Sequence, residues 1–412
     1  MSSKCLDELS PQLARRVIEA VGGPGTPPAT GFQYFTRGIQ PYIGVLDDEY
    51  LRTFLKDGGS AFKLVIGAYG GGKTHFLYCV RDLAWSNGFV VSYVSLKQGE
   101  SPFHQLDLVY KAVVKGLTPP PLEDGHSGEL EAGIRAFLKS WVGSTMAGSA
   151  STDVLLDRLA TIEVEDLSFG NAMHAAVQAL LDGRTADFDL TCQWLAGEGY
   201  IRGMHAKHGI LHRLDKTVAF AMLRSLAQFV RAVGYSGLVV LLDEAERVPS
   251  LSTKQKEQHL SHLREVIDES ANDRLPGVLI AYAVPDESFL DGRAQVYEAL
   301  RQRVETVFED LNPTGVRINL DTLAEDQAQD PRDVLREIGR DLAGIYRRAY
   351  DTSLDSNLVD ALVSMVAEHA YELRFGDTGY KRVFVQRLVR GLHYVRLRRQ
   401  LPSAEDLEPK DR

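Results

Sequence analysis

The stretch Gly67–Thr74 constrains this chain more than any other part of the sequence, because it reads Gly-Ala-Tyr-Gly-Gly-Gly-Lys-Thr. This is the pattern G-x-x-x-x-G-K-[ST], in which glycines let backbone N–H groups curl around an anion and the next helix adds partial positive charge. The apolar run Phe62–Ile66 before it predicts a buried strand, and the apolar spacing in His75–Trp85 predicts a helix. Strand, loop and helix are the setting that the motif needs, so we predict a phosphate-binding loop; the alternative is a glycine-rich turn.

The loop also carries the two side chains that a nucleotide site needs. Lys73 can reach the β- and γ-phosphates, and the Thr74 hydroxyl can ligate Mg²⁺. We therefore predict ATP and Mg²⁺ as cofactors. The residues expected to contact the nucleotide form one continuous run: Gly67, Ala68, Tyr69, Gly70, Gly71, Gly72, Lys73, Thr74 and His75.

A second signal is the apolar run Gly237–Glu244, which ends in two adjacent acids. Consecutive apolar residues are typical of central parallel strands, which are buried on both faces. Ligands of open α/β sheets bind at the carboxyl ends of such strands. Asp243 is therefore predicted to hold Mg²⁺, directly or through water, and Glu244 to polarise the attacking water as general base. The alternative is two acids that cap a strand in solvent.

The remaining pattern predicts an α/β fold, a P-loop parallel sheet flanked by helices. Further strands are expected at residues 89–96, 277–284 and 316–320, and strand, helix and strand in succession predict a right-handed parallel βαβ unit. A helical insertion is expected at about 104–231. The expected organisation is an N-terminal helical segment 1–60, a P-loop core 61–320 and a C-terminal all-helical lid domain 321–412.

Several arginines are candidates for stabilising charge on the transferred phosphate. Arg301 and Arg303 end a predicted helix and could project into a neighbouring subunit's site, where such a finger contributes roughly 10³–10⁵ in rate. This hypothesis requires a homo-oligomer, and the alternative is surface arginines paired with a nearby Glu. Arg382, or else Arg374, could reach the γ-phosphate from the lid side, because both lie near the start of the last predicted helix.

The last predicted helix, residues 380–401, is both amphipathic and basic. Its apolar stripe predicts packing against the protein and consists of Phe384, Leu388, Leu392 and Val395. Between Tyr380 and Arg399 it has no acid and seven basic residues: Lys381, Arg382, Arg387, Arg390, Arg396, Arg398 and Arg399. The basic side chains could contact DNA phosphates or an acidic partner, and a solvated charged face is the alternative. The net charge of −10 argues against a protein coated with nucleic-acid-binding surface, but it leaves room for a local basic strip.

Other polar groups give weaker signals. His205, His208 and His212 have a spacing that could hold a metal, but no carboxylate or thiol completes the set, so we prefer to interpret them as solvated histidines. Tyr282 and Asp286 lie at the end of a predicted strand and could orient water or the γ-phosphate.

The sequence contains no apolar run of membrane-spanning length. Its start lacks a signal-peptide core, and its three cysteines are scattered, with no C-x-x-C pair. We therefore expect a cytoplasmic protein without membrane association.

The constellation of two acids after an apolar strand, a strand between the two nucleotide motifs and a helical domain after the last strand resembles an AAA+-type ATPase. Within that class the chain is similar to the ATP-binding protein of bacterial BREX phage-defence systems, the BrxD-like family. The stretches that carry the resemblance are Ala14–Ala20 with Gly25–Pro28, Gly67–Leu77, Trp194–Glu198 and Gly234–Glu244. One departure is Gly71, where many such loops have Ser or Thr; it leaves Lys73 and Thr74 untouched.

The resemblance implies ATP hydrolysis in antiviral defence, alongside a helicase or another DNA-acting partner, and it implies DNA association. Only the basic helix near the end of the chain supports DNA binding independently. The alternatives are a nucleotide-gated switch or adaptor with little turnover, and an ATPase that remodels a protein partner. Glu244 speaks against a pure switch, because a switch does not need a general base.

Overall fold

The protein is described here from a computed structural model. The structure describes residues 6–96, 103–121, 131–148, 151–243, 252–286, 288–290, 295–309, 311–322, 329–374 and 379–408. Within these residues the central element is a six-stranded sheet of order β3-β2-β4-β5-β1-β6. Five of its strands are parallel, and the short edge strand β3 is antiparallel to β2. The strands are β1 (Ala61–Ile66), β2 (Val90–Ser95), β3 (Leu117–Thr118), β4 (Leu238–Asp243), β5 (Val278–Val284) and β6 (Arg317–Asn319).

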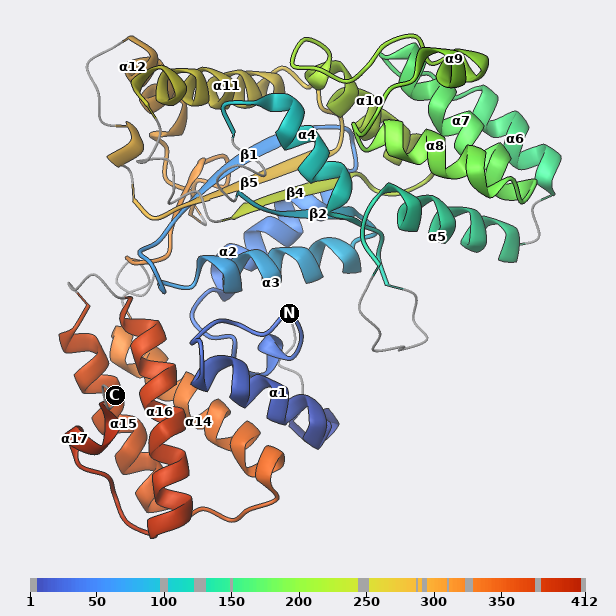
Figure 1. Ribbon diagram of the computed structural model, residues 1–412. Helices are drawn as coiled ribbons and strands as arrows, with labels where there is room; N and C mark the ends of the chain where they lie inside the picture. The colour runs from blue at the N-terminus through green and yellow to red at the C-terminus, as the bar shows by residue number, and fades with distance from the viewer. Residues whose placement is uncertain are drawn as a thin grey trace.

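Helices cover both faces of the sheet and form two further groups beyond it (Figure 1). Before and beside the sheet lie α1 (Pro11–Gly22), α2 (Gln40–Val45), the π-helix η3 (Leu46–Phe54), α3 (Lys73–Ser86) and α4 (Leu106–Lys115). The insertion between β2 and β4 continues with α5 (Ile134–Ala147), α6 (Thr152–Ala160), α7 (Leu167–Leu181), α8 (Thr185–Leu195), α9 (Arg202–His205) and α10 (Ala219–Ala232). The later helices are α11 (Thr253–Ala271), α12 (Gln295–Val304), α14 (Pro331–Tyr350), α15 (Ser356–Glu372), α16 (Tyr380–Arg398) and α17 (Ala404–Leu407).

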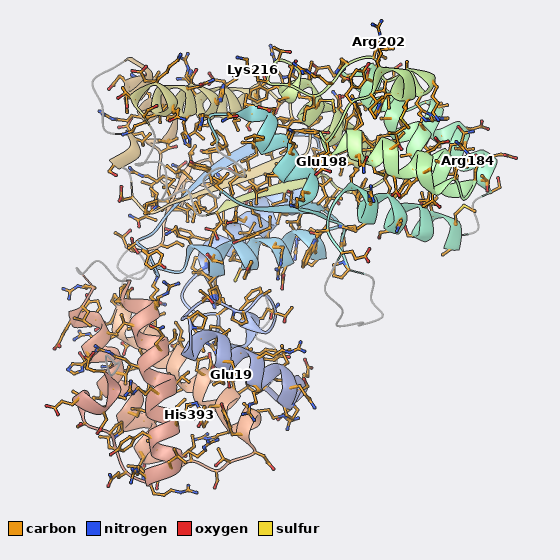
Figure 2. The ribbon with its side chains drawn as sticks, viewed as in Figure 1. Glu19, Arg184, Glu198, Arg202, Lys216 and His393 are labelled. Atoms are coloured by element: carbon orange, nitrogen blue, oxygen red, sulfur yellow. The ribbon has the colours of Figure 1, made fainter. Side chains whose placement is uncertain are left out.

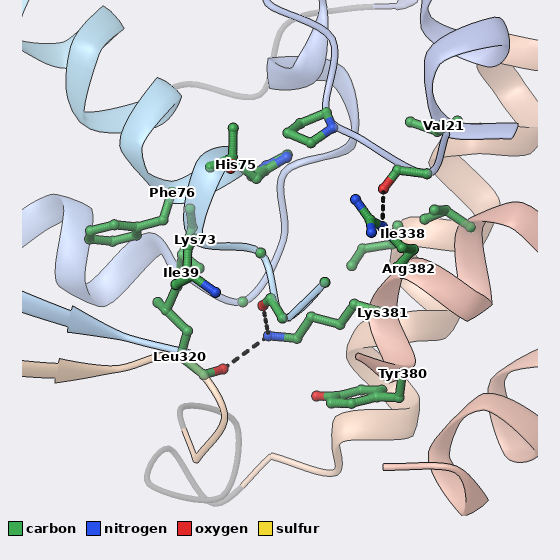
Figure 3. A pocket seen from close by; sticks show the side chains of 18 of the residues that line it. Val21, Ile39, Lys73, His75, Phe76, Leu320, Ile338, Tyr380, Lys381 and Arg382 are labelled. Carbon is green, nitrogen blue, oxygen red and sulfur yellow. Dashed lines mark hydrogen bonds between the residues drawn. The ribbon is translucent and has the colours of Figure 1, made fainter. Parts of the chain in front are cut away.

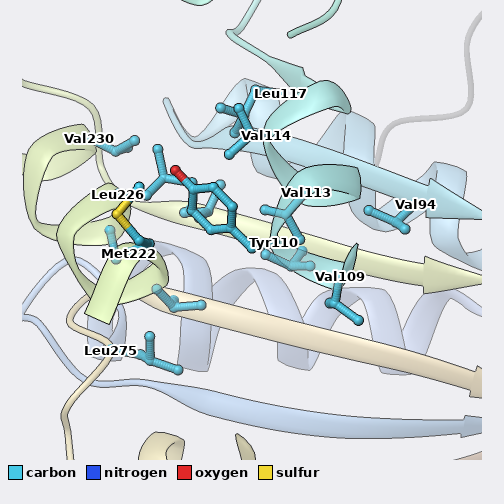
Figure 4. Packing of buried hydrophobic residues seen from close by; sticks show 14 of the residues in the cluster. Val94, Val109, Tyr110, Val113, Val114, Leu117, Met222, Leu226, Val230 and Leu275 are labelled. Atoms are coloured by element: carbon cyan, nitrogen blue, oxygen red, sulfur yellow. The ribbon is translucent and has the colours of Figure 1, made fainter. Parts of the chain in front are cut away.

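The sheet is buried on both sides, as the continuous apolar runs predict. Every residue of β1, β4 and β5 is buried. Successive side chains of a strand point to opposite faces, so Leu64 joins the core beneath α4, α10 and α11, whereas Val65 joins the core around α3. Figure 4 shows how α4 and α10 meet in the first of these cores, through Tyr110, Val113, Val114, Met222, Leu226 and Val230.

The insertion is joined to the sheet through this core. The Tyr110 ring is fully buried, and its hydroxyl donates a hydrogen bond to the carbonyl of Leu195 at the end of α8, 2.9 Å away. Trp141 of α5 likewise donates from its indole to the carbonyl of Val233, which follows α10. A buried polar group without a partner is costly, so these two bonds help to hold the insertion in one place against the core.

The C-terminal helices form a separate bundle, and α1 belongs to it by packing. In Figure 1 the blue helix α1 lies beside the orange and red helices, and it contacts α14 and α16. The Arg348 guanidinium also donates to the carbonyl of Leu9 just before α1. The apolar stripe predicted for the last helix is confirmed, since Phe384, Leu388 and Leu392 are fully buried. The division of the chain at residues 60 and 320 stays a proposal.

The predicted α/β sheet is confirmed, with one refinement in strand order. β1 and β2 are parallel members of the same sheet, but they are not neighbours, because β4 and β5 lie between them. The register pairs Ile66 with Val284 and Ser95 with Asp243. The carboxyl ends of β1, β4 and β5 therefore meet at one edge, where the phosphate loop and Asp243 both lie.

The histidines singled out by their spacing do not form a metal site. In the residues that the structure describes, no three His, Cys, Asp or Glu side chains are grouped to hold a metal ion. The interpretation as solvated histidines is wrong for His205, which is 1% exposed, packs on Tyr200 and bonds the backbone of Ile201. His212 contacts the carboxylate of Asp166, the N-cap of α7. These two rings help to hold the segment between α8 and α10 in place.

Across the described ranges, every helix is too short or too polar to span a bilayer.

Candidate nucleotide-binding site

The phosphate loop joins β1 to α3, as its sequence predicts. Gly70 and Gly72 have φ values of +77° and +104°, a backbone region that strains any residue with a Cβ. A Cβ at Gly70 would also lie 2.9 Å from the Cβ of Arg382 on α16. Glycine is therefore required at both positions by the conformation of the loop, and at Gly70 also by the close approach of the C-terminal bundle.

Lys73 and Thr74, the first residues of α3, point into the loop and towards β4. The Lys73 ammonium donates hydrogen bonds to the carbonyls of Gly67, at 2.7 Å, and of Ala68, at 3.2 Å. The Thr74 hydroxyl donates to the Asp243 carboxylate at 2.7 Å. The chain thus brings together three of the predicted site residues from segments about 170 positions apart, at the edge where ligands of parallel sheets bind.

Asp243 is held by a second hydroxyl that the sequence analysis missed. The Tyr93 hydroxyl of β2 donates to the same carboxylate oxygen as Thr74. Asp243 itself is 2% exposed, and a buried carboxylate requires hydrogen-bond donors of this kind. In the β2–β4 register Asp243 is paired with Ser95, and Tyr93 lies two residues before Ser95. This relation can be recognised only once the order of the strands is known. The predicted base Glu244 lies outside the described residues.

A cavity of about 370 Å³ opens over the phosphate loop (Figure 3). Besides the loop and the start of α3, the cavity is lined by the segment before β1, Asp243 at the end of β4, Leu320 after β6, helix α14 and the start of α16. Its apolar wall comes from Phe35, Ile39, Val334, Leu335, Ile338 and Val385. An apolar wall beside convergent polar groups is typical of a small-ligand site, and its placement next to the loop suits the base and sugar of a nucleotide.

His75, predicted to contact the cofactor, lines this cavity and braces one wall of it. Its Nε2 atom lies 2.8 Å from the Thr36 hydroxyl, and its ring packs edge-on against Phe32 and beside Phe35. Burial, reinforced by the Lys381 cation, lowers the pKa of His75 to about 4. The imidazole is therefore neutral near pH 7 and holds the segment before β1 against α3.

The C-terminal bundle contacts the phosphate loop directly through residues that sequence reasoning overlooked. The Lys381 ammonium donates to the carbonyls of Gly71, at 3.0 Å, and Leu320, at 2.9 Å, as the dashed lines in Figure 3 show. The Gly379 amide donates to the carbonyl of Tyr69 at 2.6 Å, and a Cβ at Gly379 would lie 2.2 Å from that oxygen. Burial lowers the pKa of Lys381, while the carboxylate of Asp321 opposes this shift.

Asp321, just after β6, completes this contact. Its carboxylate accepts the Ala68 amide at 2.7 Å, which anchors the start of the phosphate loop. The sequence signal that could have identified Gly379 and Lys381 is Gly-Tyr-Lys-Arg at 379–382, which places a glycine before two cations at a helix start. From sequence alone, only Arg382 of these residues is predicted to contact the nucleotide.

The two lid-side arginine candidates lie in different places. Arg382 lines the cavity, donates from Nε to the carbonyl of Gly25 at 3.3 Å and stacks 4.5 Å from the ring centre of Tyr69. Arg374 instead stacks on Tyr371, 4.1 Å from its ring centre, and donates to the carbonyl of the same residue. The geometry favours Arg382 for contact with a bound nucleotide.

The candidate finger residues on α12 contact their own subunit. Arg303 forms an ion pair with Asp268 of α11 at 2.5 Å. Arg301 donates to the carbonyl of Leu290 at 3.0 Å and lies 3.8 Å from Glu298. These contacts match the alternative of surface ion pairs, and the finger stays a proposal.

The end of β5 does not direct its candidate residues to the site. The Tyr282 side chain is fully buried on the face of the sheet opposite α3, where its hydroxyl lies 2.9 Å from the His259 ring. The Asp286 carboxylate accepts the backbone N–H of Ser288. Alternate residues of β5 face opposite sides of the sheet, and Tyr282 is on the side of α11. It therefore points away from the phosphate loop, and the expectation that it orients water is wrong.

The seven basic residues between Tyr380 and Arg399, six on α16 and Arg399 at its C-cap, lie in several environments. Lys381 and Arg382 line the cavity, Arg387 pairs with Glu408, and Arg399 donates to the carbonyl of Ser353. Arg396 stacks on Tyr350 of α14, 4.4 Å from the ring centre. The basic surface left for an external partner is therefore smaller than the sequence suggests, and it lies towards the far end of the helix.

A phosphate loop after β1, a buried acid at the end of β4 and a helical bundle that contacts the loop define a P-loop nucleotide-binding protein. The chain belongs to the family of BREX system ATP-binding proteins BrxC/D, whose model matches residues 9–411. The predicted resemblance is thereby confirmed.

Among solved structures the chain is similar to the crystal structure of Cdc6p from Pyrobaculum aerophilum, with 12% identity, a TM-score of 0.42 and coverage of 93% of this chain and 67% of that one. No curated protein matches the chain.

Replacing Lys381 by methionine should weaken ATP binding by about 10- to 100-fold. A hydrogen bond from a charged group is worth about 1.5–3 kcal/mol, each 1.4 kcal/mol is tenfold in affinity, and the variant also removes a cation beside the phosphate loop. Titration with a slowly hydrolysed ATP analogue measures the effect. Arg387→Met is the matched control, because it removes a cation of the same helix that pairs with Glu408 outside the cavity. Equal affinities for both variants would contradict the assignment.

Proposed function

We propose that this protein hydrolyses ATP with Mg²⁺ and couples hydrolysis to a change in conformation within a DNA-associated defence complex. The observation that carries the proposal is the hydrogen bond between Thr74 and Asp243, because it joins the two halves of a nucleotide-hydrolysing site. Lys73 would exchange its bonds to the Gly67 and Ala68 carbonyls for phosphate oxygens. Glu244, the next residue after Asp243, would orient and deprotonate the attacking water.

The donor set around Thr74 and Asp243 fits Mg²⁺. A hydroxyl and a carboxylate oxygen lie 2.7 Å apart there, and Mg²⁺ prefers oxygen ligands and bridges to substrate phosphates. When bound, the ion would neutralise charge on the β- and γ-phosphates. In this proposal Tyr93 keeps Asp243 in position when the Thr74 hydroxyl turns from the carboxylate to the metal.

The contacts of α16 support the coupling part of the proposal. Lys381 and Gly379 bond the carbonyls of Gly71 and Tyr69 within the phosphate loop, so the C-terminal bundle rests on the atoms that surround the nucleotide phosphates. Loss of the γ-phosphate would change the charge that faces Lys381 and Arg382. We propose that residues 321–412 act as a lid, and that α1 moves with them because it packs on α14 and α16.

The partners in this proposal are inferred from the family and from charge. The family description places these proteins in BREX systems, which supports a helicase or another defence protein as partner and DNA as the substrate of the complex. The arginine finger further requires a homo-oligomer. The alternatives remain a nucleotide-gated switch with little turnover and an ATPase that remodels a protein partner.

Phosphate release from ATP by the purified chain tests the central claim. We expect release with Mg²⁺ and none with excess EDTA, because Thr74 and Asp243 can serve the phosphates only through the metal. Lys73→Ala is the control for contaminating ATPases, since it removes the phosphate-binding cation. Stable ATP retention without release, measured on the same samples, would favour the switch instead.

A further inference from the structure

Two arginines from opposite ends of the sequence converge on one tyrosine in the C-terminal bundle. The guanidinium carbon of Arg15, on α1, lies 4.8 Å from the ring centre of Tyr350, at the end of α14. The guanidinium carbon of Arg396, on α16, lies 4.4 Å from the same ring centre. We call these three residues the Arg15–Tyr350–Arg396 cluster. Its members meet only because α1 packs on α14 and α16.

The cluster is held in place by aromatic contacts beneath it. The rings of Tyr346 and Tyr350 lie 4.6 Å apart, and the His393 ring packs edge-on against both. The Tyr346 hydroxyl bonds the His393 Nδ1 atom at 2.7 Å. A stacked guanidinium keeps its N–H donors available at the ring edge, while its position is fixed by the ring. Arg15 is exposed and Arg396 is partly buried, so two cations held against one ring lie at the surface of the bundle.

The two arginines of this cluster differ from other arginines of the bundle in their ion pairing. Within the described residues, neither Arg15 nor Arg396 has a carboxylate within ion-pair distance, in contrast to Arg332, Arg336 and Arg387 in the same bundle. The pKa of His393 is lowered by burial and by the charges of Arg396 and Arg15, against the opposing charge of Glu19. Figure 2 shows Glu19 and His393 in the same bundle. Within the described residues, two arginines that form no ion pair thus lie together on a chain whose net charge is −10.

We propose that the Arg15–Tyr350–Arg396 cluster is a docking site for the phosphate backbone of nucleic acid. Each strand of a duplex presents a charge about every 3.4 Å, so two fixed guanidiniums can engage nearby phosphates whatever the sequence. The Tyr350 ring is covered by guanidinium and aromatic neighbours, which leaves no face for stacking on a base. The contact therefore positions the protein on nucleic acid without reading sequence. This inference rests on the DNA-association part of the proposed function.

A salt titration with matched variants tests the site. Binding of a fluorescent 30-base-pair duplex and of a single strand of the same length is measured for the full chain with ATP analogue present. Arg15→Gln/Arg396→Gln should weaken binding and reduce the slope of log K against log salt by about two, because roughly one counterion is released for each phosphate neutralised. The control Arg16→Gln/Arg398→Gln makes the same charge change on exposed residues of the same two helices, and it should bind as the parent does.

The outcomes separate the site from the wider proposal. If the parent binds DNA and both double variants weaken it equally, the effect is one of net charge and the cluster is not the site. If the parent binds neither duplex nor single strand at low salt, the DNA part of the proposed function fails, and this site fails with it. If the cluster variant binds poly-L-glutamate more weakly than the parent does but binds both DNAs as the parent does, the surface takes acidic protein, and the nucleic-acid assignment is overturned. Thermal unfolding and nucleotide binding of each variant confirm folding.

Discussion

Replacing Glu244 by glutamine is expected to lower ATP turnover by about 10²–10⁴-fold while ATP binding stays intact. Glutamine has nearly the shape of glutamate but cannot accept the proton of the attacking water. Lys73, proposed to hold the phosphates, and Thr74, proposed to hold Mg²⁺, are unchanged in this variant. Steady-state phosphate release and titration with ATP give the two quantities separately.

Glu246→Gln is the matched control, because it makes the same chemical change two residues further along. It should keep turnover near that of the parent. Turnover by Glu244→Gln equal to the parent's would show that Glu244 is not the base, and the mechanism would need another one. Loss of ATP binding in Glu244→Gln would instead assign that residue to the nucleotide pocket.

Removing the candidate finger should lower turnover by about 10³–10⁵-fold if α12 supplies an arginine to a neighbouring subunit. The change is Arg301→Ala together with Arg303→Ala. Mixing this variant with Lys73→Ala subunits should restore part of the activity, because some interfaces then combine an intact phosphate loop with an intact finger. Phosphate release across a series of mixing ratios gives the measurement.

The structure sets a condition on this second prediction. Arg303 is paired with Asp268 of its own subunit, and Arg301 donates to the Leu290 carbonyl. A finger must therefore exchange its own-subunit contact for phosphate when an oligomer forms. Asp268→Asn should then leave turnover unchanged or raise it. If neither arginine variant lowers turnover and no mixture recovers activity, the finger is excluded and the two arginines serve only to join α12 to the rest of its own subunit.

Local sequence patterns predicted most of the elements correctly. The phosphate loop could be read from its motif, because glycines with positive φ, a lysine and a threonine must follow one another in the chain to surround a phosphate. The buried strands β1, β4 and β5 could be read from continuous apolar runs, because both faces of a central strand are covered. Asp243 was placed at the site by the same reasoning, and its bond with Thr74 agrees with that placement.

The contacts between distant segments could not be read in this way. Tyr93 reaches Asp243 only because β2 lies next to β4 in the sheet. Tyr282 also lies near the end of a strand, but its side chain points to the other face of the sheet, where it meets α11. The order of the strands and the face to which each side chain points are set by packing over the whole sheet. The sequence of a single strand contains neither.

The sequence by itself thus determined that the chain has a phosphate loop, an acidic strand end and an amphipathic, basic last helix, since each is a property of neighbouring residues. Only the tertiary structure decided which cations of the last helix contact the phosphate loop and which pack elsewhere in the bundle. Lys381 lies on the carbonyl of Gly71, and Arg396 lies with Arg15 on Tyr350, although both cations belong to one helix. The physical reason is that a helix presents its residues to several directions, and what each one meets depends on elements hundreds of positions away.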